Sequence, residues 1–441
     1  MRAHSIADDR PRPADEKTEH TRRWFLVALA IFLTCSGASV ARSAGEPYRS
    51  VEPTSGAPSQ ADVRDVINVV DKGADPTGRM DSAPAFRAAL GSDRIIRVPP
   101  GTYLFNSTEP APCCAHNPTA VLVRGLENFA IDGYGAKIVL GDPIAASTAL
   151  HFHQDTNFVV RGLDIHGTRA GVNPEFENVG IALSSVVRFR IEDITISGNF
   201  GDNGAGIAGD WMVDGFFNNI AMEAVGQCAD VAFLQNVTFA RLRANGAGHD
   251  GPSLANSSGR KCFSIINDTP NKATNRTGVA FAETNAVRIT DSSVTNFATG
   301  AYVASGSDIV FMRNRWYRND GLARSPGIGI LITFAGSGKF SSAGVPPRNI
   351  VIIGDVFVEN GSNRPGYAIR INSKPIRNDD TIGTVTIENC VFKDNTRVAI
   401  SSAIASKVSK LIIKGNEFSG NKQSINIDDN AKTLVASSVG E

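Results

Sequence analysis

Short apolar runs separated by turn residues are the first pattern along the chain. Residues 67–70 (INVV) and 95–98 (IIRV) predict strands, and the second run leads through Pro-Pro-Gly into a further strand at 102–105. Between the first two runs, Asp81 can cap a short helix whose apolar positions from 85 to 90 share one face. The fold is therefore expected to begin with strands and one short helix.

A spacing of apolar residues and asparagine recurs through the rest of the chain. The template is an apolar residue, any four residues, a second apolar residue, any two residues, and Asn. Several intervals between copies approach one or two multiples of the roughly twenty residues in a solenoid coil, which predicts stacked coils with the excess residues in loops. The copies are Ile191, Ile196, Asn199; Val237, Leu242, Asn245; Phe311, Trp316, Asn319; Ile352, Phe357, Asn360; Ile387, Phe392, Asn395; and Ile413, Phe418, Asn421.

The strands that precede these copies alternate apolar and small residues. In the run 180–183 (GIAL), alternation sends Ile181 and Leu183 to one side and Ala182, with the following Ser184, to the other. We expect the first side to be the core. The Asn of each copy is expected to adopt left-handed backbone at a sharp corner and to stack on the Asn of the next coil, a structural role rather than a ligand role.

Composition favours the all-β class and argues against one kind of partner. Val, Ile and Thr recur in short runs and aromatic residues other than Phe are few, which favours strands over helices. Lys plus Arg and Asp plus Glu are balanced at 44 each, so there is no net field to hold a nucleic-acid backbone. Nucleic acid is not an expected partner.

Residues 1–44 are predicted to be an export signal. Arginines at 22–23 precede the apolar run 27–33, which is shorter than the roughly 20 residues needed to span a bilayer and resembles a twin-arginine signal. Small residues follow, so we expect cleavage near their end, no stable membrane insertion afterwards, and a periplasmic or secreted protein. The alternative is an uncleaved membrane anchor. Residues 45–60 are rich in Pro, Ser and Gly and are expected to be a linker.

The cysteines suggest a disulfide in this oxidising location. One of them, Cys35, lies in the predicted signal. Cys228 with Cys262 is the first pairing to test, because the two bracket the longest irregular stretch; buried small core residues are the alternative. The cysteines of the mature chain are Cys113, Cys114, Cys228, Cys262 and Cys390, an odd set that leaves at least one thiol unpaired.

The opening motif resembles a known superfamily. Gly-Ala-Asp-Pro-Thr-Gly at 73–78, then Asp81, then Val-Pro-Pro-Gly-Thr-Tyr at 98–103, is similar to the start of the pectate-lyase-like superfamily, which includes rhamnogalacturonases, polygalacturonases, epimerases and phage tailspikes. The resemblance implies an all-β, single-stranded, right-handed parallel β-helix (a solenoid) with a short N-terminal cap helix, and a polysaccharide as partner. Many chemistries occur on this scaffold, so the motif indicates the fold more strongly than the reaction.

The resemblance and the repeats together give expected domain boundaries. Residues 61–105 are expected to form the N-terminal cap and first strands, and 106–430 the right-handed parallel β-helix. Residues 431–441 are expected to be a C-terminal tail. Because the interior of such a fold is filled by apolar stacks, function is expected on an outer face near long loops.

Acidic residues and one histidine are candidates for catalysis. The longest loop region, 246–277, contains His249 and Asp250, and two upstream coils carry Asp210 and Asp230. Their spacing of roughly one coil would bring them close together along the axis, at about 4.8 Å per strand. We predict that Asp210 and Asp230 are a catalytic acid and base and that His249 and Asp250 complete the site.

Two acids on neighbouring coils suit glycoside hydrolysis, which needs carboxyl groups about 5 to 5.5 Å apart for retention or 6.5 to 9.5 Å for inversion. The run Gly248, His249, Asp250, Gly251 also resembles the Gly-His-Gly motif of polygalacturonases. The chain has no Asn-Thr-Asp, no Asp-Asp pair in the strand where that family carries it, and no Arg-Ile-Lys in the following coil. These departures argue against the polygalacturonases and leave acid-based hydrolysis open.

Elimination from a uronate is the other reaction left open, since it needs a base and a group that neutralises the carboxylate. His249 and Lys261 are candidates in the long loop region. Alternation with apolar neighbours points His151, His153 and Arg370 outward. We predict that His151, His153, Lys261 and Arg370 bind the sugar chain.

Aromatic residues give a further set of candidates. Trp211, Tyr302 and Tyr317 could stack on sugar rings, whereas Trp316 occupies the apolar position of the repeat and is expected in the core. No loop has the acidic spacing of an EF-hand, although Asp and Asn are abundant enough for calcium, and no Cys/His spacing indicates zinc. We predict neither a metal nor an organic cofactor.

The sequence thus predicts an extracytoplasmic enzyme that cleaves or modifies a polysaccharide, with an acidic one favoured by the cationic candidates. Polysaccharide lyase and glycoside hydrolase remain open. The alternative is a non-catalytic β-helix that binds or organises surface polysaccharide. A monomer is expected because nothing resembles a trimerising coiled-coil tail.

Overall fold

The computed structural model divides the chain into two compact units, Met1–Thr54 and Ser55–Glu441, and every residue that it describes lies in the second. The described residues are 65–110, 118–144, 147–167, 179–198, 204–223, 225–246, 259–266, 284–320, 327–335, 346–361, 366–374, 381–402, 407–427 and 433–436.

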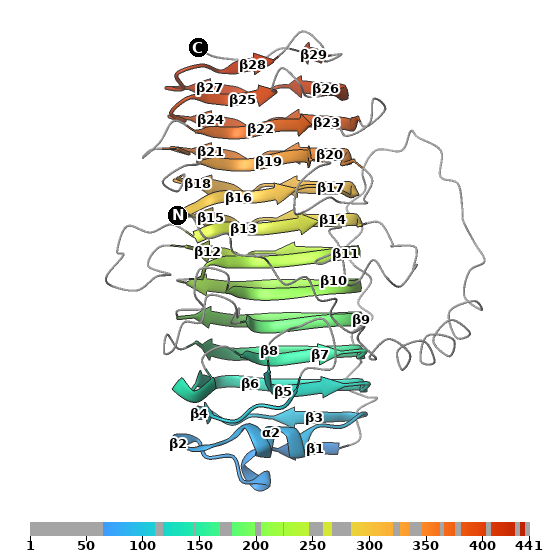
Figure 1. The fold of residues 1–441 in the computed structure, drawn as a ribbon, viewed down its shortest axis with the longest axis vertical. Coiled ribbons are helices and arrows are strands. Elements are labelled where there is room, and N and C mark those ends of the chain that lie inside the picture. The colour runs from blue at the N-terminus through green and yellow to red at the C-terminus, as the bar shows by residue number, and fades with distance from the viewer. Residues whose placement is uncertain are drawn as a thin grey trace, which may run out of the picture. The chain divides into compact units, whose positions relative to one another are not determined.

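The strands lie above one another in parallel stacks, so that each turn of the chain adds a coil to a parallel β-helix (Figure 1). Stack A consists of β5 (Thr119–Arg124), β7 (Thr148–His153), the starts of β9, β10 and β11, and then β13 (Gly259–Ile266), β16 (Phe297–Val303), β19 (Ile328–Ala335), β22 (Tyr367–Lys374), β25 (Val398–Ser402) and β28 (Ile425–Ile427). Long strands bend through corners and join the stacks: β6 (Glu127–Leu140), β8 (Thr156–His166), β9 (Val179–Ser197), β10 (Ala205–Glu223) and β11 (Gln227–Ala240).

The other stacks continue the same coils. Stack B consists of β1 (Asp65–Asn68), β3 (Arg94–Arg97), parts of the long strands, β14 (Asn285–Thr290), β17 (Ser307–Met312), β20 (Arg348–Ile353), β23 (Ile382–Glu388), β26 (Val408–Lys414) and β29 (Thr433–Ala436). Stack C consists of β2 (Thr77–Asp81), β4 (Gly101–Phe105), the ends of β6, β8, β9 and β10, and then β12 (Arg243–Asn245), β15 (Ser293–Thr295), β18 (Arg315–Tyr317), β21 (Val356–Val358), β24 (Val391–Lys393) and β27 (Glu417–Ser419).

Helices are confined to short segments among the described residues. They are η4 (Val70–Lys72), α2 (Ala83–Ala89) and η5 (Asp142–Ile144). The predicted cap helix is confirmed as α2, where Phe86 packs edge-on against Tyr103 and Phe105 at centroid distances of 5.5 and 4.8 Å. Ser82, not Asp81, is the N-cap residue, although the Asp81 carboxylate accepts the Ala83 N–H at 3.1 Å. No helix in the described part of the chain is long and apolar enough to cross a membrane.

The core consists of apolar side chains that stack from coil to coil. Phe357 lies 5.0 Å from Phe392, which lies 5.0 Å from Phe418, with nearly parallel rings. Trp316, which occupies the same repeat position, is fully buried and lies 6.2 Å from Phe357. The apolar repeat therefore marks the core, as the sequence predicts.

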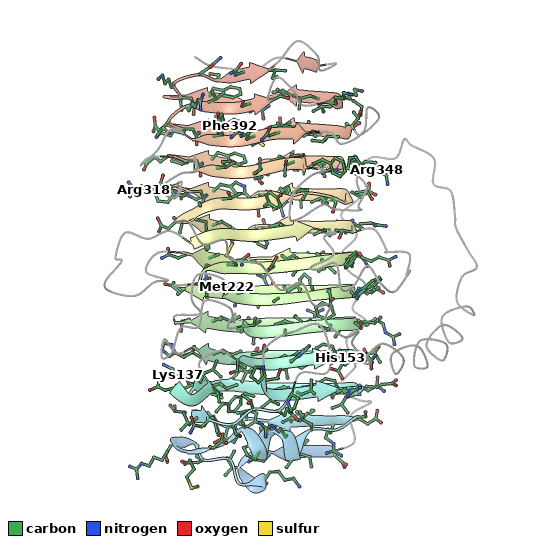
Figure 2. All side chains as sticks on the ribbon, viewed as in Figure 1. Lys137, His153, Met222, Arg318, Arg348 and Phe392 are labelled. Carbon is green, nitrogen blue, oxygen red and sulfur yellow. A yellow bond between two sulfur atoms is a disulfide. The ribbon has the colours of Figure 1, made fainter. Side chains whose placement is uncertain are left out.

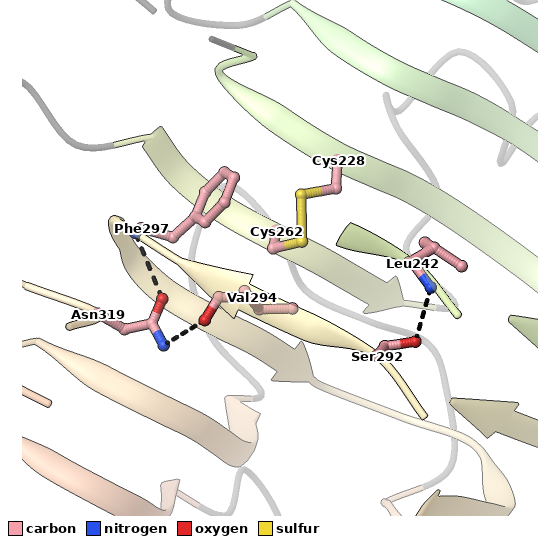
Figure 3. Close-up of a disulfide and its surroundings, with 7 residues drawn as sticks. All are labelled: Cys228, Leu242, Cys262, Ser292, Val294, Phe297 and Asn319. Carbon is pink, nitrogen blue, oxygen red and sulfur yellow. Dashed lines mark hydrogen bonds between the residues drawn. A yellow bond between two sulfur atoms is a disulfide. The ribbon is translucent and has the colours of Figure 1, made fainter. Parts of the chain in front are cut away.

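Asparagines form a ladder along the corner that follows stack C, and all but the last of them are fully buried. The Nδ2 of Asn319 donates to Oδ1 of Asn360 at 3.0 Å, Asn360 donates to Asn395 at 2.9 Å, and Asn395 donates to Asn421 at 2.8 Å. At the start of this ladder, Asn319 also accepts the Phe297 N–H (Figure 3). The predicted stacking of Asn upon Asn is confirmed for these four residues. It is wrong for Asn245, which lies on β12 in register with Thr295 and Tyr317, two positions before the ladder position.

The prediction that these asparagines themselves adopt left-handed backbone is wrong. The left-handed residue is the one before each Asn: Arg318, Glu359, Asp394 and Gly420, with φ of 46°, 53°, 54° and 63°. This residue turns the chain and aims the following Asn side chain inward, where its amide can satisfy backbone groups of neighbouring coils. Asn199, the first predicted member, lies outside the described residues.

A disulfide joins Cys228 on β11 to Cys262 on β13, as predicted first among the pairings (Figure 3). Both residues are fully buried and lie on neighbouring strands of stack A. Cys390 is a buried free thiol. Cys35, Cys113 and Cys114 lie outside the described residues.

The coils extend past the boundary predicted at residue 430. Strand β29 (Thr433–Ala436) lies in the segment expected to be a tail, and it pairs with β26 from Leu411 onward. At the other end, α2 packs against η4 and β5 beside the first coil (Figure 1). The predicted signal and linker, 1–60, lie outside the described residues.

Candidate functional site

The outward positions of stack A carry the candidate carboxyl pair. Asp210 on β10 pairs with Ser184 on β9 and Ala232 on β11, whereas Asp230 on β11 pairs with Ala208 on β10. Their inward neighbours Ile207, Ala229 and Val231 are almost fully buried, and both aspartates are partly exposed. Because side chains alternate along a strand, Asp210 and Asp230 lie on the same outer face.

The register fixes how far apart the two aspartates lie. They lie on adjacent strands. Asp210 pairs with Ala232, and Asp230 lies two residues before Ala232 on the same strand. A strand separation of about 4.8 Å and a rise of about 3.3 Å per residue give roughly 8 Å between their Cα atoms. This diagonal arrangement lets two carboxyl groups face one sugar linkage from neighbouring positions.

The two histidines occupy the same outward columns as the aspartates. His151 pairs with Ala182, Ala182 pairs with Ala208, and Ala208 pairs with Asp230. His153 pairs with Ser184, which pairs with Asp210. The sequence predicts them to be exposed, but their side chains are only 0% and 6% exposed. Figure 2 shows His153 at the level of β7. Alternation gave the correct side of the strand, but it carries no information about what covers that side.

Burial changes the chemistry of these groups. Desolvation, with a smaller contribution from His153, lowers the pKa of His151 to about 4, so this imidazole is neutral at pH 7. Its Nε2 lies 3.3 Å from the Ser184 hydroxyl, and its Nδ1 is buried without a hydrogen-bond partner. Asp155 accepts the His153 N–H at 2.9 Å, and burial raises its pKa to about 6. Ser184 and Asp155 were missed by sequence reasoning because neither belongs to a recognisable motif.

Arg370 lies on the same column as Asp230 but further along the axis. The column runs from Asp230 through Ser264, Tyr302 and Leu331 to Arg370. Four strand steps correspond to roughly 19 Å, so Arg370 does not share a reaction centre with Asp230. The Arg370 guanidinium instead lies 4.8 Å from the centroid of the Tyr367 ring.

The remaining predicted site residues are only partly located. His249 and Asp250 lie outside the described residues. Lys261 lies on β13, where its backbone pairs with Gln227 and Thr299. In the described ranges, no group of three or more His, Cys, Asp or Glu side chains is placed to hold a metal ion.

Strand β9 presents small residues to the outside beside the aspartates. Its outward positions Ala182 and Ser184 and the corner residue Ser185 lie between the coil of β7 and the coil of β10. Trp211 follows Asp210 directly, is partly exposed, and stacks on Phe233 with ring centroids 4.8 Å apart. Small groups therefore adjoin a carboxylate and an aromatic ring at this corner.

The parallel coils define a β-helix protein, and a family model places the chain within that class. The model described as "Right handed beta helix region" matches residues 216–439. The chain belongs to this right-handed parallel β-helix family, as the pectate-lyase-like opening motif implied. Among curated proteins, no sequence matches the chain.

Solved structures of the same fold include an enzyme, a tailspike and an adhesin. The A-module of mannuronan C-5 epimerase AlgE4 from Azotobacter vinelandii has 16% identity and a TM-score of 0.51 over 85% of this chain and 100% of that chain. A tailspike of Escherichia coli bacteriophage HK620, solved with a pentasaccharide, has 12% identity and a TM-score of 0.57 over 84% and 66%. The Streptococcus pneumoniae surface adhesin PfbA has 14% identity and a TM-score of 0.51 over 84% and 99%. At these identities the likeness concerns the fold.

Proposed function

We propose that the protein is an exported glycoside hydrolase that cleaves a polysaccharide bound along the outer face of stack A. The observation that carries this proposal is the placement of Asp210 and Asp230 on adjacent strands and on one outer face. Two carboxyl groups so placed can serve as general acid and general base on opposite sides of one glycosidic bond.

The separation favours inversion. With Cα atoms roughly 8 Å apart, side chains that run parallel to each other would hold the two carboxyl groups in the range of about 6.5 to 9.5 Å that leaves room for a water molecule. One aspartic acid protonates the leaving oxygen, and the other aspartate takes a proton from the water that attacks the anomeric carbon. No redox partner or cofactor enters this balance.

The rest of the column suits a long substrate. Tyr302 and Arg370 lie on the column of Asp230 at increasing distance from it and are both partly exposed. Arg370, roughly 19 Å away, would contact a sugar residue remote from the cleaved bond, and its charge favours an acidic chain. The tailspike with bound pentasaccharide and the mannuronan epimerase have this fold, which supports a polysaccharide as the ligand.

The proposal includes an extracytoplasmic location and a monomer. The paired arginines before a short apolar run support export, and the Cys228–Cys262 disulfide suits an oxidising compartment. Removal of the predicted signal at 1–44 would leave the β-helix free of the membrane.

The test is incubation of the purified chain with neutral and uronic polysaccharides while reducing ends and absorbance near 235 nm are both followed. We expect new reducing ends without new absorbance. Asp210→Asn and Asp230→Asn should each lower the rate by roughly 10²- to 10⁴-fold, because each removes a proton-transfer group. Asp214→Asn is the matched control, since Asp214 is an exposed residue of the same strand that accepts a hydrogen bond from Asn236.

Two outcomes would replace the proposal. Reducing ends accompanied by absorbance would indicate elimination, which needs a base and a group that neutralises the uronate carboxylate rather than two carboxyl groups. Binding without any cleavage would favour a non-catalytic β-helix that binds or organises polysaccharide, and a surface adhesin has the same fold.

A further inference from the structure

One corner of the β-helix carries bulky aromatic residues where the backbone is left-handed. Gln154, Ser185, Trp211 and Phe233 stand on successive coils, each directly after a position that is paired in the register of stack A. Their φ values are 59°, 59°, 56° and 53°. On the coil of β5 the same corner is occupied by Gly125 with φ 64°.

A tryptophan at such a position is unfavourable unless something compensates for it. The left-handed region suits Gly and, less well, Asn or Asp, whereas large side chains rarely adopt it. Phe233 is 6% exposed and packs against the protein, but Trp211 is partly exposed and gains less from burial. Left-handed residues mark many corners of the coils, so what distinguishes this position is the partly exposed indole of Trp211 that it carries.

The space over Ser185, between the side chains of Trp211 and Gln154, is called the slot. One face of the ring stacks on Phe233 at 4.8 Å with an interplanar angle of 18°. On the opposite side the next corner residue is Ser185, which is exposed and carries only a hydroxymethyl group, followed by the exposed Gln154. Two strand steps separate Trp211 from Gln154, roughly 9.6 Å. Since contacting rings lie about 4 Å apart, this interval accepts one further ring.

We propose that Trp211 is the platform on which one pyranose ring of the polysaccharide stacks, above Ser185 and opposite Gln154. The inference deepens the proposed function and rests on it, because Asp210 immediately precedes Trp211 and so places the stacked ring beside the carboxyl pair. The aromatic face contacts the C–H groups of the sugar, and the Gln154 amide is long enough to hydrogen-bond its hydroxyl groups.

Binding is measured separately from cleavage. Full-length Asp230→Asn protein, in which turnover is expected to be slowed at least about 10²-fold, is titrated calorimetrically with cellohexaose, hexagalacturonate and hexamannuronate. Trp211→Ala in this background should weaken binding of the preferred probe by about tenfold or more, because it removes an aromatic contact surface. Trp211→Phe keeps an aromatic face and should stay within about threefold.

Controls separate stacking from folding. Tyr317→Ala removes a partly exposed aromatic side chain of stack C, which lies near Arg318 and away from the slot, and should leave binding unchanged. Thermal unfolding of each variant is recorded, and binding is compared at a temperature at which every variant is folded, because Trp211→Ala also removes the contact with the Phe233 ring.

The outcomes separate this inference from the proposed function. Binding that depends on Trp211, with no cleavage by the unmodified protein, supports the platform and overturns the hydrolase. Cleavage with binding unaffected by Trp211→Ala overturns the platform and keeps the hydrolase. Absence of binding to all three probes overturns the platform.

Discussion

Removing one rung of the asparagine ladder should destabilise the protein far more than removing an exposed amide. The Asn360 side chain is fully buried. Its Oδ1 accepts from the Asn319 backbone N–H at 3.3 Å and from Asn319 Nδ2 at 3.0 Å, while its Nδ2 donates to the Trp316 carbonyl at 3.1 Å and to Asn395 at 2.9 Å. Asn360→Ala would therefore leave two buried polar groups of the preceding coil without their hydrogen-bond partner.

The expected cost follows from those groups. The Asn319 N–H and the Trp316 carbonyl each lose a partner that water cannot replace in the core. At about 1 to 3 kcal/mol for each buried group left without a hydrogen bond, the free energy of unfolding should fall by about 2 to 6 kcal/mol. Asn395 keeps another donor, since the Asn360 backbone N–H still reaches its Oδ1 at 3.2 Å.

The assay is urea unfolding followed by circular dichroism. Gln235→Ala is the matched control, because it removes an exposed amide from a central coil and should change the free energy of unfolding by about 0.5 kcal/mol or less. An Asn360→Ala protein as stable as this control would refute the view that the ladder holds successive coils together.

The remaining predictions concern the disulfide and one buried acid. The double variant Cys228→Ala, Cys262→Ala removes the disulfide, which joins residues 34 positions apart in the sequence. In the loop-entropy model its loss should lower the free energy of unfolding, measured with urea, by about 4 kcal/mol. Equal stability of the parent protein under reducing and oxidising conditions would contradict this. Burial raises the pKa of Asp355 from 3.8 to about 7. Because the folded state then keeps a proton that the unfolded state releases, Asp355 costs stability progressively as pH rises from about 4 to about 7, by on the order of 4 kcal/mol. The difference in unfolding free energy between the parent and Asp355→Asn, measured across that window, should show this slope; a difference independent of pH would refute it.

The fold could be predicted because its signals are local and repeated. The second apolar position of the repeat places Trp316 and Phe357 in the core, and the terminal Asn forms the expected ladder. Which residue turns left-handed was not predictable from the same pattern, because Arg318 and Glu359 have no preference for that conformation. The repeat located the corner, but the residue that adopts left-handed backbone there is set by the path of the chain through the turn.

The site could be predicted only in part. Alternation along the strand predicts that Asp210 and Asp230 point outward, and the length of one coil predicts that they lie on neighbouring strands. Both features are local in the sequence, so the closeness of the two residues could be predicted. The burial of His151 depends on tertiary packing over the strand, which no alternation encodes. Arg370 lies too far along the axis to join them, since the number of coils between two residues depends on loop lengths.

The most direct test of the central claim is the configuration of the first product, followed by proton NMR during hydrolysis of a polysaccharide that the protein cleaves. The placement of Asp210 and Asp230 predicts inversion, so the first anomeric signal to appear should have the configuration opposite to that of the cleaved bond. A first product with retained configuration would contradict the separation of the carboxyl pair, and signals of an unsaturated sugar would contradict hydrolysis itself.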